Sequence, residues 1–328
     1  IAGNVQLPPG PHAKAVDRYE AVRRYIERPG SPLEGRVVCF YPQGSMAIDA
    51  TTSTRGTDDE YDLDIAAEIE GRDDGPEALL DDLEEALKGY PVSRIVRQTR
   101  CVTLYYADGM HLDVTPSRRR APKEKEGEIP HAKKGARTES PRYVPMNAYA
   151  FAQWYLIRTP VEERFALALN RRLYEEAGIA FAAAEVEEVP PQTPLIIKSV
   201  TTVALQLIKR HRNIVYATET GRIPPSVVLS CHAGHAARLG LGLADMVIRQ
   251  SRWTASAIDE AARQRRLLSV LNPEFAAERF TDRWPETQLQ QTTYSRHLHT
   301  LANGLEAARN GNVQLEDLQA WHRDQFGD

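Results

Sequence analysis

The sequence is poor in cysteine and has no long apolar run. Its three cysteines, Cys39, Cys101 and Cys231, stand far apart, so they form neither a metal-binding cluster nor a disulfide framework. Such usage is typical of a reducing compartment, and we expect a cytoplasmic protein. No apolar stretch approaches the roughly 20 residues of a membrane span. Residues 1–12 lack the charged-then-apolar layout of a signal peptide, so we expect no membrane association.

The chain also lacks an excess of basic charge. Its 41 Lys and Arg against 45 Asp and Glu give a formal net charge of −4, which disfavours a dedicated duplex-binding protein. A local basic segment runs from Arg118 to Arg142, with nine Lys and Arg against four Glu. It could cover anionic substrates or receive a nucleic acid, but we favour a solvated loop.

Length and composition predict a globular protein of two lobes. The 328 residues are 42% hydrophobic and 26% charged, which suits a chain with a sizeable core. Helix and strand patterns are mixed up to about residue 145, and helical periodicity prevails beyond it. We therefore expect an α+β fold with one domain at 1–145, which includes an N-terminal helix, and an α-helical domain at 146–328.

The expected elements follow from the period of the apolar residues. The predicted strands are 37–41, 61–69, 92–97, 101–106 and 110–115, and the helices that accompany them are 13–27 and 78–87. The segment 116–145 has no periodicity and is expected to be a long mobile loop or a lobe connection. Later helices are predicted at 148–157, 161–177, 194–212, 224–239, 255–271, 287–309 and 314–326.

Two aspartates alternate on the strand expected at 61–69. Side chains two residues apart point the same way, so Asp62 and Asp64 project from one face. Neighbouring carboxylates repel each other unless a cation lies between them, and Mg²⁺ prefers oxygen ligands and phosphates. Upstream, Gly44 and Ser45 follow the first strand. Gly44 lets the backbone approach a phosphate, and Ser45 can donate from its hydroxyl and its amide.

A third aspartate, Asp113, lies in the strand expected at 110–115, directly after a hairpin signal. If this strand lies beside the first, three carboxylates converge, and they can hold one Mg²⁺ and bridge a second. One ion would activate the attacking hydroxyl and the other would neutralise the leaving pyrophosphate. His111 would share a face with Asp113 and could orient a substrate group, although such a histidine is more often a packed neighbour.

Each of these pieces is unspecific when taken alone. An isolated Asp-x-Asp is most often a solvated strand edge, and a Gly-Ser pair is often a plain turn with a serine cap. The order Gly-Ser, then Asp-x-Asp, then a third Asp in a later strand is far more specific. The set predicts a site for a metal-bound nucleoside triphosphate.

These motifs resemble the nucleotidyltransferase superfamily with the polymerase-β palm, and within it the bacterial CD-NTases, relatives of cyclic GMP–AMP synthase and oligoadenylate synthetase. The matching segments are QGS (43–45), YDLDI (61–65), LDVTP (112–116), LQLIKRHRN (205–213), IPPSVVLSCHA (223–233) and LNPEF with RFTDRW (271–284). The resemblance implies a mixed-sheet palm with helices and a C-terminal α-helical lobe that closes the active-site cleft. It also implies synthesis of cyclic di- or trinucleotide second messengers during phage infection.

The resemblance assigns two groups of residues in the palm. The carboxylates that would be catalytic and would bind two Mg²⁺ or Mn²⁺ ions are Asp62, Asp64 and Asp113. The residues that would contact the donor nucleotide are Gln43, Gly44 and Ser45. Asp113 would additionally stand near the acceptor hydroxyl.

In the helical lobe the resemblance implies a lysine and a later serine that hold the donor triphosphate. Lys209 and Ser226 are the best-placed residues for these roles. Lys198 is a second candidate, because it lies about three helical turns before Lys209 and would share its face. Animal relatives place a tyrosine for base stacking where this chain has Val227, so the identity of the base stays open. They also carry a zinc element for binding duplex DNA. Because this chain has no Cys/His cluster, the resemblance implies no obligatory dependence on duplex DNA.

We interpret the chain as a metal-dependent nucleotidyltransferase that joins nucleoside triphosphates, with ATP preferred, into a small adenosine-containing cyclic oligonucleotide. An RNA-tailing nucleotidyltransferase is the enzymatic alternative, but it would need a continuous basic track. A non-catalytic nucleotide-binding regulator is the other alternative, and the intact aspartate triplet argues against it. We expect the chain to be monomeric on its own, and a regulatory protein could dock on it.

Overall fold

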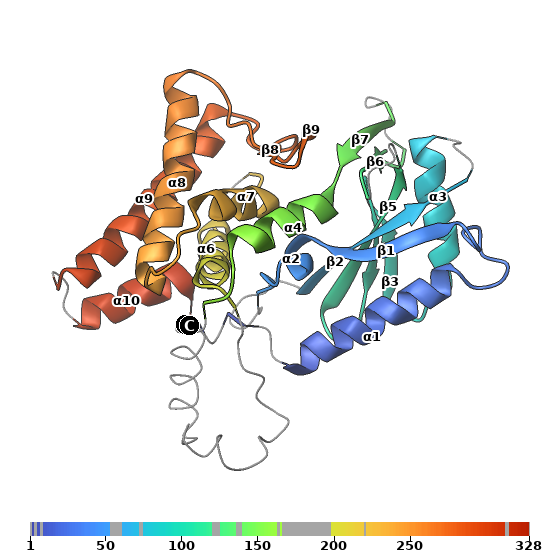
Figure 1. Ribbon diagram of the computed structural model, residues 1–328, viewed down its shortest axis with the longest axis horizontal. Helices are drawn as coiled ribbons and strands as arrows, with labels where there is room; N and C mark the ends of the chain where they lie inside the picture. The colour runs from blue at the N-terminus through green and yellow to red at the C-terminus, as the bar shows by residue number, and fades with distance from the viewer. Residues whose placement is uncertain are drawn as a thin grey trace, which may run out of the picture.

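The computed structural model places a sheet lobe and a helical lobe side by side (Figure 1). It describes residues 2, 5–6, 9–52, 61–71, 75–119, 125–135, 140–162, 165, 198–219, 221–311 and 315–327. The side chains at 9–13, 61–62 and 315 lie outside this description. Helix α4 (Ala148–Arg158) follows the last strand of the sheet lobe and leads into the helical lobe (Figure 1). The boundary expected at 145/146 falls at the end of that strand.

The sheet lobe is built on a mixed seven-stranded sheet. Its strands run in the order β1-β2-β5-β4-β3, and β5 also pairs with β6, which pairs with β7. Their bounds are β1 Val37–Gln43, β2 Tyr61–Ile69, β3 Arg94–Arg97, β4 Val102–Tyr105, β5 Met110–Arg119, β6 Gly127–His131 and β7 Arg142–Met146. The pair β2–β5 is parallel, whereas the other pairs are antiparallel.

Two helices bury one face of this sheet. Helices α1 (Pro9–Ile26) and α3 (Pro76–Leu87) share one apolar cluster with β2, β4 and β5. Leu79, Leu83 and Leu87 of α3 are buried there, and Leu63 and Ile65 of β2 join them. Because side chains alternate along a strand, the burial of these two residues turns Asp64 to the opposite face of the sheet.

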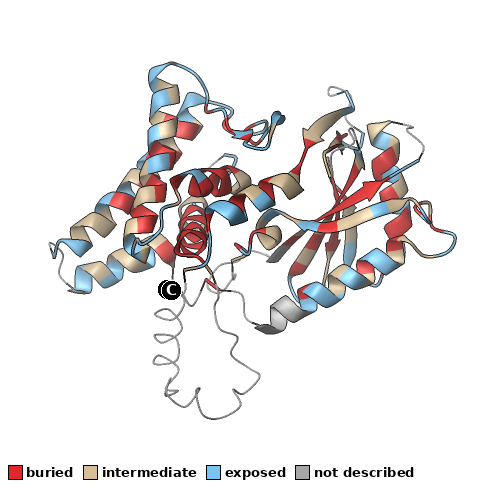
Figure 2. Ribbon diagram, viewed as in Figure 1, coloured by how far each residue is buried: buried red, intermediate tan, exposed pale blue. Residues whose placement is uncertain are grey.

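The helical lobe surrounds a helix that is buried along most of its length. Residues 200–212 of α6 are all buried, and the helix appears as a continuous red segment in Figure 2. The other elements of this lobe are α7 Ser226–Ala236, α8 Leu243–Arg263, β8 Leu271–Asn272, β9 Phe275–Arg279, α9 Gln288–Arg309 and α10 Leu315–Phe326, with α6 itself at Val200–Tyr216. None of the helices in the described part of the chain is long and apolar enough to cross a membrane.

The prediction of a mobile loop at 116–145 is wrong for the residues that the structure describes. Strand β5 continues to Arg119, and β6 and β7 follow it in the sheet. The charged residues that obscured the strand pattern in the sequence form ion pairs. Arg118 lies 2.8 Å from Glu128, and Arg119 lies 2.6 Å from Glu68. The Arg118 guanidinium also lies 3.5 Å from the centre of the Tyr143 ring. A solvated loop is therefore the wrong description of this part of the segment.

Two predicted helix positions also need correction. The helix expected at 255–271 begins at Leu243 and ends at Arg263, and the strand β8 begins at Leu271. The helix expected at 194–212 begins only at Val200, because Ser199 caps it by accepting from the amide of Thr202. The helix expected at 161–177 lies almost entirely outside the described residues.

Candidate active site

The turn after β1 brings backbone against a carboxylate. Gly44 has φ +60°, and a Cβ placed on it would lie 2.2 Å from Oδ2 of Asp64. Only glycine provides that space and that left-handed conformation together. Ser45 follows in the short helix α2 (Gly44–Ala47) and lines the same cavity as Gly44 and Asp64. The Gly-Ser turn is thus packed against the strand that carries the Asp-x-Asp motif.

The parallel strands β2 and β5 place two of the predicted carboxylates side by side. Asp64 is in register with Asp113, and Asp62 is in register with His111. Neighbouring strands lie about 4.8 Å apart, so one cation can reach both carboxylates. Asp64 and Asp113 are half-buried, and His111 lines the cavity with its ring 5.4 Å from that of Tyr105. The backbone of Asp62 is placed, but its side chain lies outside the described residues.

Gln43 is held by the sheet. Its Nε2 donates to Thr115 Oγ1 at 3.0 Å and to the carbonyl oxygen of Ile65 at 3.4 Å. The residue also lines the cavity, so its side chain joins the wall on the side of β2 and β5. These contacts fix the end of β1 from which the Gly44–Ser45 turn departs.

Lys209 of α6 reaches across from the helical lobe to that turn. Its Nζ donates to Ser45 Oγ at 2.6 Å and to the Ala50 carbonyl oxygen at 2.9 Å, and the residue is 4% exposed. A buried ammonium is costly unless it is hydrogen-bonded, and these oxygens supply that compensation. The structure therefore brings Lys209, Ser45 and Gly44 together at one wall of the cavity.

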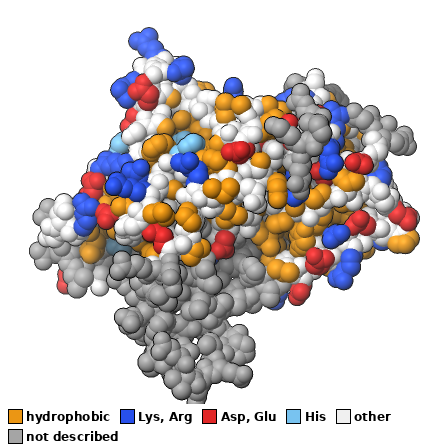
Figure 3. Space-filling view, in the orientation of Figure 1, with side chains coloured by type: hydrophobic (Ala, Val, Ile, Leu, Met, Phe, Trp, Pro, Cys, Tyr) orange, Lys and Arg blue, Asp and Glu red, His pale blue; other side chains and the backbone are white. Residues whose placement is uncertain are grey.

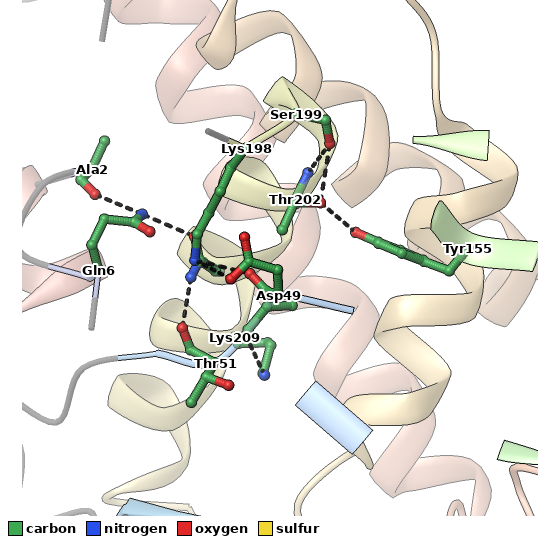
Figure 4. A network of polar contacts seen from close by, with 11 residues as sticks. Ala2, Gln6, Asp49, Thr51, Tyr155, Lys198, Ser199, Thr202 and Lys209 are labelled. Atoms are coloured by element: carbon green, nitrogen blue, oxygen red, sulfur yellow. Dashed lines mark hydrogen bonds and ion pairs between the residues drawn. The ribbon is translucent and has the colours of Figure 1, made fainter. Parts of the chain in front are cut away.

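Lys198 does not share a helix face with Lys209, and that prediction is wrong. It precedes α6 and lies against Asp49, with Nζ 3.0 Å from Oδ1 and 2.9 Å from the carbonyl oxygen (Figure 4). The helix begins later than its periodicity suggested because Ser199 caps it. Lys198 is not among the described residues that line the cavity.

Ser226 begins α7 and lines the cavity next to Val227. Its Oγ accepts from Arg212 Nη1 at 2.9 Å, and the same nitrogen donates to the Pro224 carbonyl oxygen at 2.9 Å. Arg212 therefore ties the start of α7 to α6, which carries Lys209. The two residues that the resemblance assigned to the triphosphate lie on neighbouring helices around one cavity.

The cavity between the lobes has a volume of about 770 Å³. Such a size lies in the upper part of the range of small-molecule sites. Three of the described residues that line it carry carboxylates, namely Asp64, Glu278 and Asp282. Glu278 is already bound, because its Oε2 accepts from the Asn147 amide at 2.8 Å and from Asn272 Nδ2 at 2.7 Å. Burial raises the pKa of Glu278.

Asp282 is the lining carboxylate at which the two lobes meet. It accepts from Nη2 of Arg100, which lies in the turn between β3 and β4 and donates from Nε to His131 Nδ1 at 2.9 Å. The Asp282 side chain is 32% exposed, so it stays accessible from the cavity. Sequence reasoning missed both Arg100 and Asp282. The RFTDRW segment contained the aspartate, but nothing local in the sequence indicated its partner.

Sequence reasoning also missed two residues that contact Asp113. Thr103 lies opposite Asp113 in the register of β4 and β5, and Cys101 immediately precedes β4. Burial, and then the charge of Asp113, raise the pKa of the Cys101 thiol. The alternation Cys101, Thr103, Tyr105 against apolar Val102 and Leu104 was the available signal.

Known proteins resemble the chain along its whole length. Residues 2–143 match the Second Messenger Oligonucleotide or Dinucleotide Synthetase (SMODS) domain. All 328 residues align at 83% identity with the cyclic dinucleotide synthase CdnG of Bradyrhizobium diazoefficiens, covering 79% of that protein.

Solved structures are similar as well. The CD-NTase CdnG of Bradyrhizobium diazoefficiens in complex with GTP superposes with a TM-score of 0.89 at 81% identity, over 100% of this chain and 92% of that chain. The CdnC:HORMA-deltaN complex of E. coli MS115-1 gives a TM-score of 0.65 at 13% identity, over 99% of this chain and 94% of that chain, which is a likeness of fold. The mixed sheet with an α-helical second lobe, as expected from the sequence, is confirmed.

Proposed function

The chain belongs to the CD-NTase family and is a nucleotidyltransferase, and on that basis we propose that it joins two nucleotides, at least one of them from GTP, into a cyclic dinucleotide. The observation that carries the proposal is the register of Asp64 beside Asp113, with Gly44 packed against Asp64 at a cavity shared by both lobes. The GTP complex of the 81% identical structure and the name of the 83% identical relative support the choice of substrate and product.

The carboxylates of β2 and β5 suit divalent cations. Hard oxygen ligands that are in register on neighbouring strands are the donor set that Mg²⁺ or Mn²⁺ takes. Asp62, Asp64 and Asp113 would hold a two-ion site, which when bound would neutralise the triphosphate and activate the acceptor hydroxyl. Gly44 keeps the space that the Asp64 carboxylate needs, and the β-sheet fixes the spacing of the strands.

The donor triphosphate would lie between the Gly44–Ser45 turn and α6. The Lys209 ammonium and the Ser45 hydroxyl, 2.6 Å apart, present donors to the same place, and the Ser226 hydroxyl faces the cavity from α7. The acceptor hydroxyl oxygen would attack the α-phosphorus and pyrophosphate would leave, a reaction in which positioning and charge stabilisation dominate. A second transfer within the same cavity would close the ring.

Asp282 gives the cavity a means to select guanine. The Watson–Crick edge of guanine carries two neighbouring N–H donors, whereas adenine presents an acceptor there, which a carboxylate repels. Of the three carboxylates among the described lining residues, Asp64 faces the metal site and Glu278 is occupied by Asn147 and Asn272. Asp282 is held by Arg100, but its side chain stays 32% exposed at the cavity, so it can still accept from a base.

Several finer expectations remain predictions. They are ATP as a substrate, an adenosine-containing or cyclic trinucleotide product, a role in defence against phage, a cytoplasmic location, a monomeric state and a regulatory protein partner. ATP as the second substrate is compatible with the proposal, because only one of the two bases needs to contact Asp282.

The RNA-tailing alternative finds less support than a cyclic product. RNA binding requires a continuous basic surface. On the face in Figure 3, the described Lys and Arg side chains are interspersed with Asp and Glu. Arg118 and Arg119, which lie in the segment expected to be a loop, are paired with Glu128 and Glu68, respectively.

Pyrophosphate release tests the proposal. The purified chain is incubated with each nucleoside triphosphate in the presence of Mg²⁺ or Mn²⁺, and Asp64→Asn serves as the inactive comparison. We expect metal-dependent release with GTP and a loss of at least roughly a hundredfold in the variant, because removing a metal ligand removes charge stabilisation. Undiminished turnover by Asp64→Asn would overturn the catalytic assignment.

A further inference from the structure

Strand β4 has one apolar face and one face turned toward the catalytic carboxylates. Val102 and Leu104 are fully buried in the sheet-lobe core. Side chains alternate along a strand, so Thr103 points to the other side. Thr103 is in register with Asp113 of the neighbouring strand β5. This places a hydroxyl directly beside the carboxylate that completes the predicted metal site.

Two side chains meet Asp113 from this side. Thr103 Oγ1 donates to Asp113 Oδ1 at 2.5 Å, and the Cys101 thiol lies close enough to Asp113 for the charge of the carboxylate to raise the pKa of the thiol. A hydroxyl bond to an ionised carboxylate at this distance belongs to the stronger class of hydrogen bonds. The Thr103 hydroxyl carries no charge, so it orients the carboxylate without cancelling the charge that a cation needs.

Neither side chain is placed to contact a substrate. Thr103 is 3% exposed and Cys101 is 9% exposed, and neither is among the described residues that line the cavity. Thr103 is β-branched and has few χ1 rotamers, which keeps its hydroxyl in one direction. A side chain that touches the carboxylate and is closed off from the cavity can act only through that carboxylate.

We propose that Thr103, supported by Cys101, is a positioning residue that holds the Asp113 carboxylate beside Asp64 for metal binding. This inference rests on the proposed function, because it assumes that Asp113 is a metal ligand. Without the hydroxyl, Asp113 would sample orientations in which its oxygens no longer face the cation. Residues that orient metal ligands in this way typically change metal affinity or activity by about 10- to 100-fold when they are mutated.

The test compares Thr103→Val, which keeps the shape and removes the donor, with Thr103→Ser, which keeps the donor. Thr254→Val is a matched control, since Thr254 is equally buried in the helical lobe and its hydroxyl meets His232 at 3.2 Å. Binding of Mn²⁺ alone is measured by titration calorimetry, alongside pyrophosphate release from GTP. Mn²⁺ binding that is lost in Asp64→Asn is assigned to the predicted metal site.

We expect Thr103→Val to bind Mn²⁺ roughly 10- to 100-fold more weakly, and Thr103→Ser and Thr254→Val to stay close to the parent. If Thr103→Val fails to fold, Cys101→Ala removes the second side chain and should weaken Mn²⁺ binding by a smaller factor. Unchanged Mn²⁺ affinity in Thr103→Val, with a parent that does bind Mn²⁺ through Asp64, would overturn this inference alone. A parent chain that binds no Mn²⁺ through Asp64 would overturn the proposed metal site and this inference with it.

Discussion

At the scale of single residues, the site depends on a glycine that leaves room for a carboxylate. Asp64 Oδ2 lies only 2.2 Å from the position that a Cβ on residue 44 would take. The turn and the strand are far apart in sequence, but the antiparallel pairing of β1 with β2 sets Gln43 opposite Asp64. The close approach is therefore a consequence of sheet register, and any side chain at residue 44 has to move the carboxylate.

Gly44→Ala should abolish turnover because it displaces the Asp64 carboxylate. Gly30→Ala is the matched control, since Gly30 also has positive φ but has no atom within 4 Å of the added Cβ. Both variants should lose roughly 1–2 kcal/mol of unfolding free energy from backbone strain. Only Gly44→Ala should lose activity by at least about a hundredfold. Equal activities of the two variants in a pyrophosphate assay would contradict the account of this turn.

Asp282→Asn should lower kcat/KM for GTP by roughly 10- to 100-fold, because an ionised acceptor for two N–H donors is replaced by an amide. ITP lacks the exocyclic amine, so the parent should prefer GTP over ITP and the variant should lose most of that preference. Glu286→Gln is the control. Glu286 lies in the same loop as Asp282, between β9 and α9, and its exposed carboxylate is paired with Arg222. If Asp282→Asn keeps the parent ratio of GTP to ITP, Asp282 does not read the base.

At the scale of elements, α6 acts as the tie between the lobes. Lys209 holds Ser45 and the Ala50 carbonyl oxygen, and Gln206 Nε2 donates to the Thr51 carbonyl oxygen at 2.6 Å. Just before the helix, Lys198 holds Asp49 (Figure 4). Helix α6 and the residue before its cap therefore hold three successive residues after the Gly44–Ser45 turn, at positions 49–51. The position of the turn is set by the helical lobe as much as by the sheet.

The two lysines should behave differently when they are replaced by methionine. Lys209→Met removes a cation at the cavity wall and should raise KM for GTP by roughly 10- to 100-fold. Lys198→Met removes a pair whose Asp49 side chain is 59% exposed, so it should leave KM within about threefold. Steady-state kinetics at saturating metal distinguish them. A larger KM effect in Lys198→Met than in Lys209→Met would reverse the assignment.

Sequence patterns were sufficient where one face of an element is apolar. Strand β2 was placed at its observed bounds, because Leu63 and Ile65 alternate with the aspartates in its first half and apolar residues follow. The strand pair β6–β7 was missed, since Arg118 and Glu128 are satisfied by each other across strands and no local pattern shows a distant partner. Lys198 was wrongly placed on a helix, because the apolar periodicity extends N-terminal to Ser199, the residue that caps α6. Alternation around Thr103 indicated which face of its strand it occupies, but its partner Asp113 became apparent only once β4 and β5 were known to pair.

At the scale of the whole molecule, the lobes are joined at two further points around the cavity. Glu278 of β9 binds the amide of Asn147 where the sheet lobe passes into α4. Arg100 of the sheet lobe is hydrogen-bonded to Asp282 of the helical lobe, and both residues line the cavity. The cavity is therefore enclosed by contacts from both lobes, and its shape depends on their relative position.

Acid should destabilise the chain through two buried histidines. Burial lowers the pKa of His211 and of His232 to about 4. Between about pH 6.5 and pH 4 the unfolded chain binds protons that the folded chain does not, so stability falls as pH falls, by up to about 1.4 kcal/mol per pH unit for each histidine. Urea unfolding at pH 7, 6 and 5 measures this slope. His232→Gln should make it shallower, and an identical slope would contradict the assignment.

The mass of the product shows whether the chain makes a cyclic dinucleotide. The chain is incubated with Mg²⁺ and either GTP alone or GTP with ATP, and the products are resolved by mass spectrometry before and after phosphatase treatment. A cyclic dinucleotide has no terminal phosphate, so we predict a phosphatase-resistant dinucleotide containing guanosine that is absent with Asp64→Asn. Formation of linear, phosphatase-sensitive chains of increasing length, or of no nucleotide product, would contradict the account.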